Sequence, residues 1–478
     1  MTKKKKSEYT GKLNEPIKID LTKTFDRQGR TAYILNTKLS QMATFKRIQV
    51  KESDYEKPHI INYYGVNIMS SGSGKDKITR EIDQYLLSGF RAYFNSASNE
   101  YINKKEAELL ETAKKNHPNS ENKQFEFTEK EKNKIRNIRF ELEEATQEGL
   151  FADCVTLHNS GIGSLFIKIP ELGLFLENPT QSQQLFLNSV IKLYDGESNI
   201  KSTKGESRST EVKGIPCNCL FYSDTNKLLQ DKANNYLMKL LDTGLVRRSF
   251  IAFMPEKEIS INGDYELELQ IKNKAYQEAE EINEFINKTF MAIDKDSEFQ
   301  MLPETYKIYH NYQNQNKNKY NSLLRKSDDI LLKELRGRFW KTFKLSGLIA
   351  VISHPEEPVI KPQDLEYAIY QSELFAQDFE QFFKTKPQTD TDKLFLYFLN
   401  NKGEWLATQE IKKQKFTNYN HFSRWFDENL QYVKNMAESQ GYSVKEEKFN
   451  NNSGKRYMLV ENKLGQALTV AKPLGEFV

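Results

Sequence analysis

The stretch that most constrains the fold runs from Tyr63 to Phe90, where a strand, a glycine-rich turn and a helix are expected in succession. Residues 63–69 are mostly aromatic, apolar or β-branched, which predicts a buried strand. The turn that follows is rich in serine and glycine and ends at Lys75, and apolar residues then recur at helical spacing up to Phe90. A strand that leads through a glycine turn into a helix is the context in which phosphate-binding loops are found.

The turn has the chemistry of a loop that holds phosphate groups. Glycines allow successive backbone N–H groups to turn toward an anion, the start of a helix favours negative charge, and a lysine reaches the outer phosphates. We therefore predict that ATP is bound by Ser71, Gly72, Ser73, Gly74, Lys75 and Asp76. The match to the GxxxxGK pattern is imperfect, because Met69 replaces the first glycine and Asp76 replaces the serine or threonine that binds Mg²⁺. The alternative is a surface turn that precedes a lysine.

The bulk composition places few limits on partners. The chain has 478 residues, of which 38% are hydrophobic and 28% are charged, and a formal charge of +4. A charge this close to neutral neither requires nor excludes nucleic acid. No apolar run approaches the roughly 18 residues that cross a bilayer, and the basic N-terminus lacks the apolar segment of a secretory signal. The three cysteines form no disulfide framework and the six histidines show no zinc spacing, so we expect a cytoplasmic protein without a membrane partner.

Strand and helix patterns alternate in the first half of the chain and predict an α/β fold with a parallel sheet. The later strands of this sheet are expected at 163–171, 217–222 and 249–254, with an exposed hairpin at 197–213. Short strands are expected at 17–21, 32–35 and 42–50, and helices at 106–113 and 129–145. The predicted divisions begin with a polar lead-in at 1–60 and a core at 61–260, which contains a helical insertion at 97–148. An almost wholly helical domain at 261–383 and a linker at 384–391 follow. The chain then forms a winged-helix-like unit at 392–460 and a tail at 461–478.

Hydrolysis of ATP also requires a carboxylate that holds a metal or orients water, and a positive charge on the transition state. Glu171 is the leading candidate for the carboxylate, because it ends an apolar strand whose carboxyl end should converge with the phosphate loop. Pro170 stands where an aspartate is expected before it, so Mg²⁺ would be held by Glu171, by Asp76 or by both. The alternative for Glu171 is a surface carboxylate at a strand end.

Two further groups of residues have the chemistry of a nucleotide site. Arg247 and Arg248 stand between a turn and a strand, and a guanidinium suits a phosphoryl group in transfer, often one bound to a neighbouring subunit. Ordinary surface arginines are the alternative. Ser223, Asp224 and Asn226 follow the strand at 217–222, where they would sense the γ-phosphate or cap the next helix.

The unit at 392–460 has three expected helices and a β-hairpin, which is the outline of a winged helix. Polar and basic side chains in and around its third helix and its hairpin suit contacts with DNA. They are Lys412, Lys413, Lys415, Asn418, Asn420, His421, Arg424, Trp425, Lys445, Lys448, Lys455 and Arg456. Acidic residues at 427–428 and 446–447 dilute this charge, so a solvated face of mixed charge or a protein-binding face is the alternative.

The order of these motifs resembles that of the P-loop ATPases encoded near replication genes in phages and integrated mobile elements. The motifs that carry the resemblance are SSGSGKD, GSLFIKIPELGLFLEN, LYDGESN, IPCNCLFYSDTNKLL, DTGLVRRSFIAF and DLEYAIYQSELF. The resemblance implies a RecA/AAA+-like P-loop NTPase core with a helical extension and a C-terminal winged-helix domain. It also implies that Gly74 and Lys75 hold phosphate, that Glu171 is the Walker B acid, and that Arg247 or Arg248 is an arginine finger.

The leading hypothesis is therefore an ATP-dependent DNA motor, either a replicative helicase or a replication initiator of a phage or mobile element. ATP and Mg²⁺ would bind at the subunit boundaries of a homo-oligomeric ring, for which a hexamer is one candidate. The expected partners are DNA and other replication proteins, in the cytoplasm of a bacterial host. Two alternatives are an ATP-switched DNA-binding regulator that does not unwind DNA, and a structural protein with a degenerate nucleotide fold.

Overall fold

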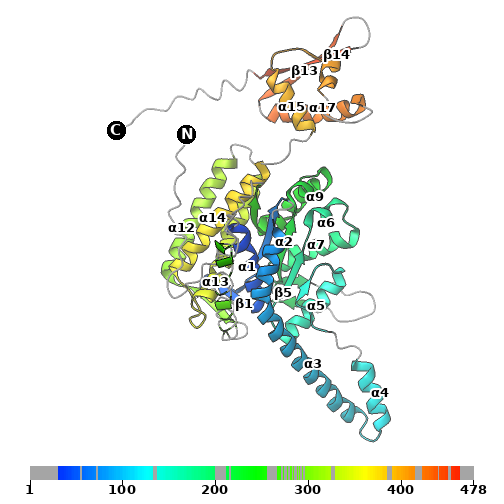
Figure 1. Cartoon of the computed structure of the whole chain (residues 1–478), viewed down its shortest axis with the longest axis vertical. Coiled ribbons are helices and arrows are strands. Elements are labelled where there is room, and N and C mark those ends of the chain that lie inside the picture. Colours follow the sequence, from blue (N-terminus) through cyan, green and yellow to red (C-terminus); the bar gives the residue numbers. More distant parts are fainter. Residues whose placement is uncertain are drawn as a thin grey trace. The chain divides into compact units, whose positions relative to one another are not determined.

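The computed structural model divides the chain into two compact units, Met1–Thr385 and Lys386–Val478 (Figure 1). The boundary falls within the segment that the sequence predicts as a linker. The structure describes residues 31–53, 56–70, 74–132, 137–199, 211–214, 217–255, 297–324, 329–384, 390–414, 422–439, 441–449 and 454–462, with scattered residues between 266 and 293.

The centre of the first unit is a parallel sheet of five strands. In spatial order they are β4 (Glu141–Leu142), β5 (Leu165–Ile169), β8 (Cys217–Ser223), β3 (Tyr64–Met69) and β9 (Phe250–Met254). Every residue of β8 and β3 is buried, as is typical of parallel strands that are covered on both faces. The α/β fold with a parallel sheet that the sequence predicts is therefore present, and its expected strands are strands of this sheet.

The helix α1 (Thr31–Phe45) lies buried against the central strands. The fully buried Asn36 donates hydrogen bonds from Nδ2 to Asn67 Oδ1 at 2.7 Å and to the Phe250 carbonyl at 3.1 Å. The predicted strand at 32–35 is wrong, because these residues belong to this helix. Other polar residues of α1 are also buried: Thr37 accepts a hydrogen bond from the sheet, Ser40 and Thr44 bond within the helix, and Gln41 bonds to Asp83. The helix therefore has no separate apolar and polar faces that would identify it in the sequence. This part of the predicted polar lead-in belongs to the core.

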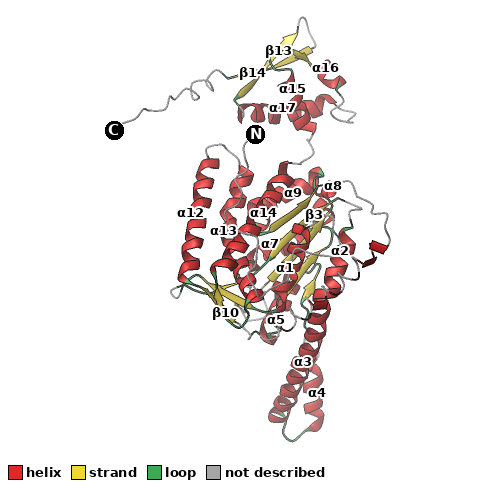
Figure 2. Cartoon of the chain, turned by 60° about the vertical axis from the view of Figure 1, so that its left-hand side comes forward, coloured by secondary structure: helices red, strands yellow, loops and turns green. Residues whose placement is uncertain are grey.

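A long helical stretch follows β3. It consists of α2 (Lys75–Ile82), the π-helical turn η1 (Asp83–Leu87) and α3 (Ser88–Asn116), and α4 (Glu121–Lys132) returns beside α3 (Figure 2). The predicted helix at 129–145 is wrong beyond Lys132, because residues 141–142 form the edge strand β4. Ile138, Phe140 and Leu142 are buried at alternate positions, which is the period of a strand and not of a helix.

Shorter helices connect the remaining strands. They are α5 (Gln147–Ser160) before β5, α6 (Leu172–Glu177) and α7 (Gln181–Leu193) after it, and α8 (Thr225–Leu228), α9 (Asp231–Thr243) and α10 (Leu245–Arg248) between β8 and β9. The expected hairpin at 197–213 is represented by the antiparallel pair β6 (Glu197–Asn199) and β7 (Glu211–Lys213). Alternating strands and helices therefore build the sheet, with the chain crossing over between parallel neighbours.

A second sheet shows that the region 261–383 is not almost wholly helical, as the sequence suggests. The strand β10 (Ser297–Met301) pairs in parallel with both β11 (Val359–Ile360) and β1 (Ile48–Lys51), and β1 pairs antiparallel with β2 (His59–Ile60). The strand expected at 42–50 thus begins only at Ile48. These strands are short, and β10 is held by a partner roughly 250 positions earlier in the chain. The sequence around β10 alone cannot predict a pairing with so distant a strand.

Three helices, α12 (Pro303–Leu324), α13 (Asp329–Ser353) and α14 (Pro362–Lys384), lie together on the side of the sheet that β9 borders (Figure 1). The carboxylate of Asp378 on α14 accepts a hydrogen bond at 3.1 Å from the backbone N–H of Phe253. Because Phe253 lies on an edge strand, this bond satisfies a donor that would otherwise be free to pair with another chain. Burial raises the pKa of Asp378 to about 6, although the bond from Phe253 acts in the opposite direction.

Replacement of Asp378 by asparagine is expected to stabilise the chain at pH 7.5 by about 2 kcal/mol. The amide oxygen still accepts the Phe253 bond, and the cost of a partly buried negative charge disappears. Because the folded-state pKa of Asp378 lies above its usual value, the wild-type carboxyl contributes stability at low pH that is lost as the pH rises through about 6. The gain measured by urea denaturation should therefore shrink by about half at pH 5. Glu126→Gln, an exposed change on α4, is the control, and a pH-independent gain in Asp378→Asn would contradict the assigned cause.

The second unit has its own sheet and its own core. Its elements are α15 (Asp390–Asn400), β12 (Leu406–Ala407), α16 (Thr408–Lys413), α17 (Phe422–Ser439), β13 (Tyr442–Phe449) and β14 (Gly454–Glu461). The antiparallel sheet has β14 at its centre, between β12 and β13. Phe398, Phe426 and Leu459 are among the apolar side chains buried between the helices and this sheet. The three helices and the hairpin expected here are present, and the two-residue strand β12 is an addition.

Candidate functional site

Gly74 and Lys75 lie after the carboxyl end of β3, where α2 begins. Gly74 has a φ of 81°, a left-handed conformation that glycine adopts without the strain a Cβ would add. Lys75 is the first residue of α2, so its side chain is placed beside unpaired backbone N–H groups that favour an anion. The predicted phosphate-binding residues Ser71, Gly72 and Ser73 lie outside the described residues.

The ammonium group of Lys75 forms an ion pair with Glu171, with 2.9 Å between Nζ and Oε2. The strand β5 delivers this carboxylate, because the strand ends at Ile169 and Glu171 then occupies the cap position before α6. The side chains of Lys75 and Glu171 are 15% and 20% exposed, so a ligand can reach both. The structure thus brings together two residues that the sequence places at the ends of separate strands.

The second oxygen of Glu171 is held by residues that follow β8. The backbone N–H of Asp224 donates to Glu171 Oε1 at 3.0 Å, and the Ser223 hydroxyl donates to the same oxygen at 3.4 Å. Lys227 adds a second cation, with its Nζ 3.8 Å from Glu171 Oε2. The carboxylate is therefore held in place from two strands before any ligand binds, which is the preorganisation that a catalytic group needs.

Asp224 caps the short helix α8. Its Oδ1 accepts hydrogen bonds from the backbone N–H groups of Asn226 at 2.8 Å and Lys227 at 3.1 Å. Capping is one of the two roles that the sequence leaves open for Asp224, and here it fixes the turn that brings Lys227 to Glu171. Sequence reasoning missed Lys227. The available signal was its place in the first turn of a helix that begins with the cap residue Asp224.

The carboxylates that would hold Mg²⁺ are Glu171 and Asp76. Asp76 is exposed in the first turn of α2, beside Lys75 in the chain. In the part of the chain that the structure describes, no three histidine, cysteine, aspartate or glutamate side chains gather in a way that would hold a metal ion. Mg²⁺ commonly takes only one or two protein carboxylates and completes its coordination with water and substrate phosphates. One or two carboxylates would therefore be enough for a Mg²⁺ ion that arrives with a nucleotide.

Arg247 and Arg248 lie at the opposite edge of the main sheet from Lys75. They end α10 and precede β9, and β9 runs parallel to β3. The arginines thus stand before the amino end of one strand, whereas Lys75 follows the carboxyl end of its neighbour. The five residues of β9 span about 16 Å between these edges. Within one chain the structure does not bring the arginines to Lys75.

The two arginines have different surroundings. The guanidinium of Arg248 pairs with Asp195, with 3.0 Å between Nη2 and Oδ2, and lies 5.5 Å from the centre of the Tyr194 ring. Arg247 makes no ion pair with any residue that the structure describes. Burial lowers the pKa of Arg247, the nearby positive charges of Arg248 and Arg336 lower it further, and the Asp195 carboxylate offsets only part of this. Arg247 is therefore the less compensated of the two.

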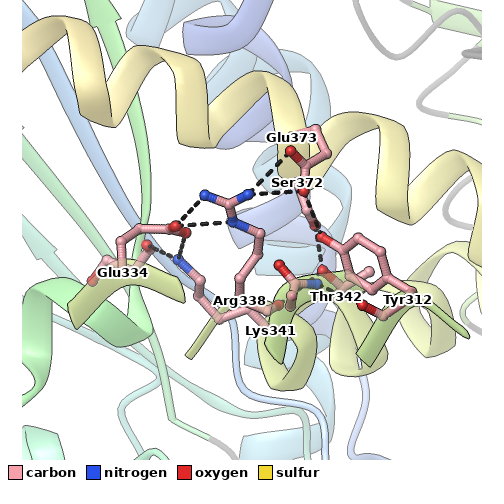
Figure 3. Close-up of polar contacts among 9 residues, drawn as sticks. Tyr312, Glu334, Arg338, Lys341, Thr342, Ser372 and Glu373 are labelled. Carbon is pink, nitrogen blue, oxygen red and sulfur yellow. Dashed lines mark hydrogen bonds and ion pairs between the residues drawn. The ribbon is translucent and has the colours of Figure 1, made fainter. Parts of the chain in front are cut away.

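A buried ion network joins α13 to α14 (Figure 3). Arg338 pairs with Glu334 and, through Nη1, with the Glu373 carboxylate at 2.9 and 3.0 Å. Lys341 lies 3.3 Å from Glu334 and donates a hydrogen bond at 2.9 Å to the carbonyl of Ser249. Burial favours the neutral form of Glu334, but the charges of Arg338 and Lys341 outweigh it and lower the pKa. The start of β9 is thus anchored to α13 by a fully paired network.

Acidic side chains pair with three of the basic residues predicted to contact DNA, Arg424, Lys455 and Arg456, and also with Lys434. The ion pairs are Lys455–Glu446 at 2.6 Å, Arg456–Glu447 at 2.8 Å, Arg424–Glu428 at 2.9 Å and Lys434–Glu446 at 3.4 Å. Lys415, Asn418, Asn420 and His421 lie outside the described residues. The described surface of α17 and the hairpin therefore carries mixed charge, which is one of the alternatives that the sequence leaves open.

No protein-family model matches the chain, and no curated protein matches it either. Among the described residues, no helix is both long enough and apolar enough to cross a membrane. The geometry around Lys75 and Glu171 is therefore the basis for assigning a function.

Proposed function

We propose that the chain is an ATPase whose nucleotide site lies between the β3–α2 turn, Glu171 and the residues that follow β8. The observation that carries this proposal is the Lys75–Glu171 ion pair, which lies at the carboxyl edge of a parallel sheet and directly after Gly74. In open α/β sheets, ligands bind outside the carboxyl ends of the strands, where the strand order reverses. The strand β3 is such a point, because the chain continues to β4, β5 and β8 on one side of it and then to β9 on the other.

The topology supports a RecA/AAA+-like P-loop core. Numbered by their appearance in the chain, the five strands lie in the order 2-3-4-1-5. The glycine turn follows strand 1, the acidic residue Glu171 follows strand 3, and the polar residues Ser223 and Asp224 come at the end of strand 4. This order and these positions are what the motif resemblance leads one to expect of such a core.

In the proposed site, Lys75 exchanges one anionic partner for another. In the free chain its ammonium group is neutralised by Glu171, and the phosphates of ATP would compete for it. Glu171 would then remain held by the Asp224 N–H and Lys227, in position to orient the attacking water. Mg²⁺ bound with ATP would be held by Asp76 and Glu171, and it would neutralise charge on the phosphates.

The second unit is proposed to be a winged helix that contacts a replication protein. Its order of helix, strand, helix, helix, strand and strand supports the winged-helix assignment. The ion pairs on α17 and the hairpin leave little net positive charge for a DNA groove. That observation favours a protein partner for this unit, while DNA would be gripped by other surfaces of the assembled particle.

We further propose that hydrolysis drives a DNA motor, either a replicative helicase or a replication initiator of a phage or mobile element. The motif resemblance supports this. So does the position of the Arg247–Arg248 pair at the opposite edge of the sheet from Lys75, because a ring would bring one of the two arginines to the nucleotide of the next subunit. ATP would then be hydrolysed at subunit boundaries, with one chain supplying Lys75 and its neighbour an arginine.

Strand displacement by the purified protein decides between the motor and an ATP-controlled switch. We expect DNA to stimulate Mg²⁺-dependent ATP hydrolysis and a labelled strand to be displaced from a forked duplex, and we expect Lys75→Ala to do neither. A protein that binds ATP and DNA but displaces no strand would be a switch and not a motor. A protein that binds no ATP would contradict both the motor and the switch.

A further inference from the structure

Three arginines meet where α10 packs against α13. Arg247 and Arg248 come from α10, and Arg336 comes from α13. The two helices touch closely at this point, because a Cβ on Gly337 would lie only 2.7 Å from the Arg247 carbonyl oxygen. Gly244, at a φ of 105°, leaves room for both α10 guanidinium groups, and a Cβ there would lie within 3 Å of each. The backbone is thus built to gather three positive charges.

The three arginines differ in what compensates their charge. Arg248 has the Asp195 carboxylate and the Tyr194 ring. Neither Arg247 nor Arg336 forms an ion pair with a residue that the structure describes. Arg338, two positions after Arg336 on α13, has two carboxylates. Arg338 and Arg248 are thus paired with carboxylates at ion-pair distance, whereas Asp195 acts on Arg247 only from a longer distance.

Arg336 is nevertheless held in a defined orientation. Its Nε and Nη2 donate hydrogen bonds to the Tyr320 hydroxyl at 3.2 and 2.6 Å, and its guanidinium lies 5.4 Å from the centre of that ring. A phenol orients the guanidinium without removing its charge. Arg336 lies near enough to Arg247 for its positive charge to lower the pKa of Arg247. An anion bound between the two side chains would relieve that repulsion.

We propose that Arg247 and Arg336 together bind a phosphate of the nucleotide held at Lys75 of a second copy of this chain, and that Arg248 anchors α10 without touching the nucleotide. The inference rests on the proposed ATPase function. Of the two arginines on α10, Arg247 would reach the nucleotide, and Arg336 of α13 would supply a second positive charge. Two guanidinium groups suit the charge that spreads over the transferring phosphoryl oxygens.

A second copy is required because of where the arginines lie. They stand at the amino edge of the sheet and Lys75 at its carboxyl edge, so one chain cannot supply both to the same phosphate. An interface that joins one edge of a subunit to the opposite edge of the next is head-to-tail, and repetition of such an interface forms a ring when the rotation between subunits closes.

Subunit mixing tests the assignment. Arg247→Ala and Arg336→Ala should each lower kcat by about 10-fold or more with unchanged ATP affinity, as expected for groups that act on the transition state. Either variant, assembled in equal amounts with Lys75→Ala chains, should recover about one quarter of the wild-type rate, because that share of interfaces joins an intact site to intact arginines. Arg248→Ala should lose thermal stability and keep its kcat. Arg139→Ala, an exposed arginine near β4, should change nothing.

Phosphate binding gives a readout that needs no hydrolysis. In the Lys75→Ala background, inorganic phosphate should raise the unfolding temperature by about 2 °C over chloride of equal ionic strength. Adding Arg247→Ala or Arg336→Ala should abolish that rise, and adding Arg248→Ala should not.

The outcomes separate the inference from the function on which it rests. If the wild-type chain hydrolyses no ATP but the phosphate response depends on Arg247 and Arg336, the ATPase proposal fails and the anion site stands. If ATP is hydrolysed but mixing restores no activity, or the phosphate response survives both substitutions, the inference is overturned. A loss of DNA affinity in Arg247→Ala and Arg336→Ala without recovery on mixing would also overturn it, since the arginines would then bind the DNA backbone.

Discussion

Replacement of Lys75 by alanine is expected to lower Mg²⁺-dependent ATP hydrolysis by about 100- to 1,000-fold. The variant loses the ammonium group that would contact the phosphates. It also leaves Glu171 without its partner at 2.9 Å, so that a negative carboxylate faces the incoming phosphates. Both effects weaken ATP binding as well as hydrolysis. Steady-state phosphate release and a titration with ATP measure the two separately.

Lys77→Ala is the matched control for this change. Lys77 lies on the same helix as Lys75 and is exposed, so its removal alters the charge of α2 without altering the site. Hydrolysis and ATP affinity should both remain near the wild-type values. An equal loss of hydrolysis in Lys77→Ala and Lys75→Ala would mean that the general charge of α2 matters rather than the site. Full hydrolysis in Lys75→Ala would mean that Lys75 is not part of an ATPase site.

Glu171→Gln is expected to abolish hydrolysis but strengthen ATP binding. The amide keeps the shape of the side chain and can still accept the hydrogen bond from the Asp224 N–H, but it no longer carries the charge that orients and activates water. The rate should fall by about 100-fold or more. ATP affinity should rise because the carboxylate that competes with phosphate for Lys75 has gone. Single-turnover kinetics measure the hydrolysis rate, and equilibrium binding measures the ATP affinity.

Glu177→Gln serves as the control, because Glu177 ends the same helix, α6, that follows Glu171. It should change neither the rate nor the affinity. The prediction is specific because Glu171→Gln should lower the hydrolysis rate and raise the ATP affinity. If hydrolysis and ATP affinity fell together, Glu171 would be a support for the loop and not the group that acts on water.

The paired positions of Lys75 and Glu171 could be predicted because each follows a mostly apolar strand. Such strands indicate a parallel sheet, and the carboxyl ends of parallel strands converge at one edge. That argument uses only local patterns and a general rule of topology. It says nothing of the turn after β8, whose Lys227 approaches Glu171 only because the cap at Asp224 sets the path of the chain.

The features that the sequence did not reveal depend on distant partners. Polar residues of α1 are buried, some of them bonded to the sheet, so the helix lacks the apolar stripe by which a helix is recognised. The strand β10 exists because β1 pairs with it. Arg336 is one charged residue among many on a long helix, and its importance follows from the contact of Gly337 with the backbone of Arg247.

The most direct test of the central claim, that the β3–α2 turn and Glu171 form an ATPase site, is Mg²⁺-dependent phosphate release from ATP by the purified wild-type chain beside Lys75→Ala, with single-stranded DNA present. A wild-type turnover of about 1 per second or faster is expected, in the ordinary range for enzymes. The variant should be slower by about 100-fold or more. Equal rates in the two proteins, or no phosphate release by a folded wild-type chain, would contradict the claim.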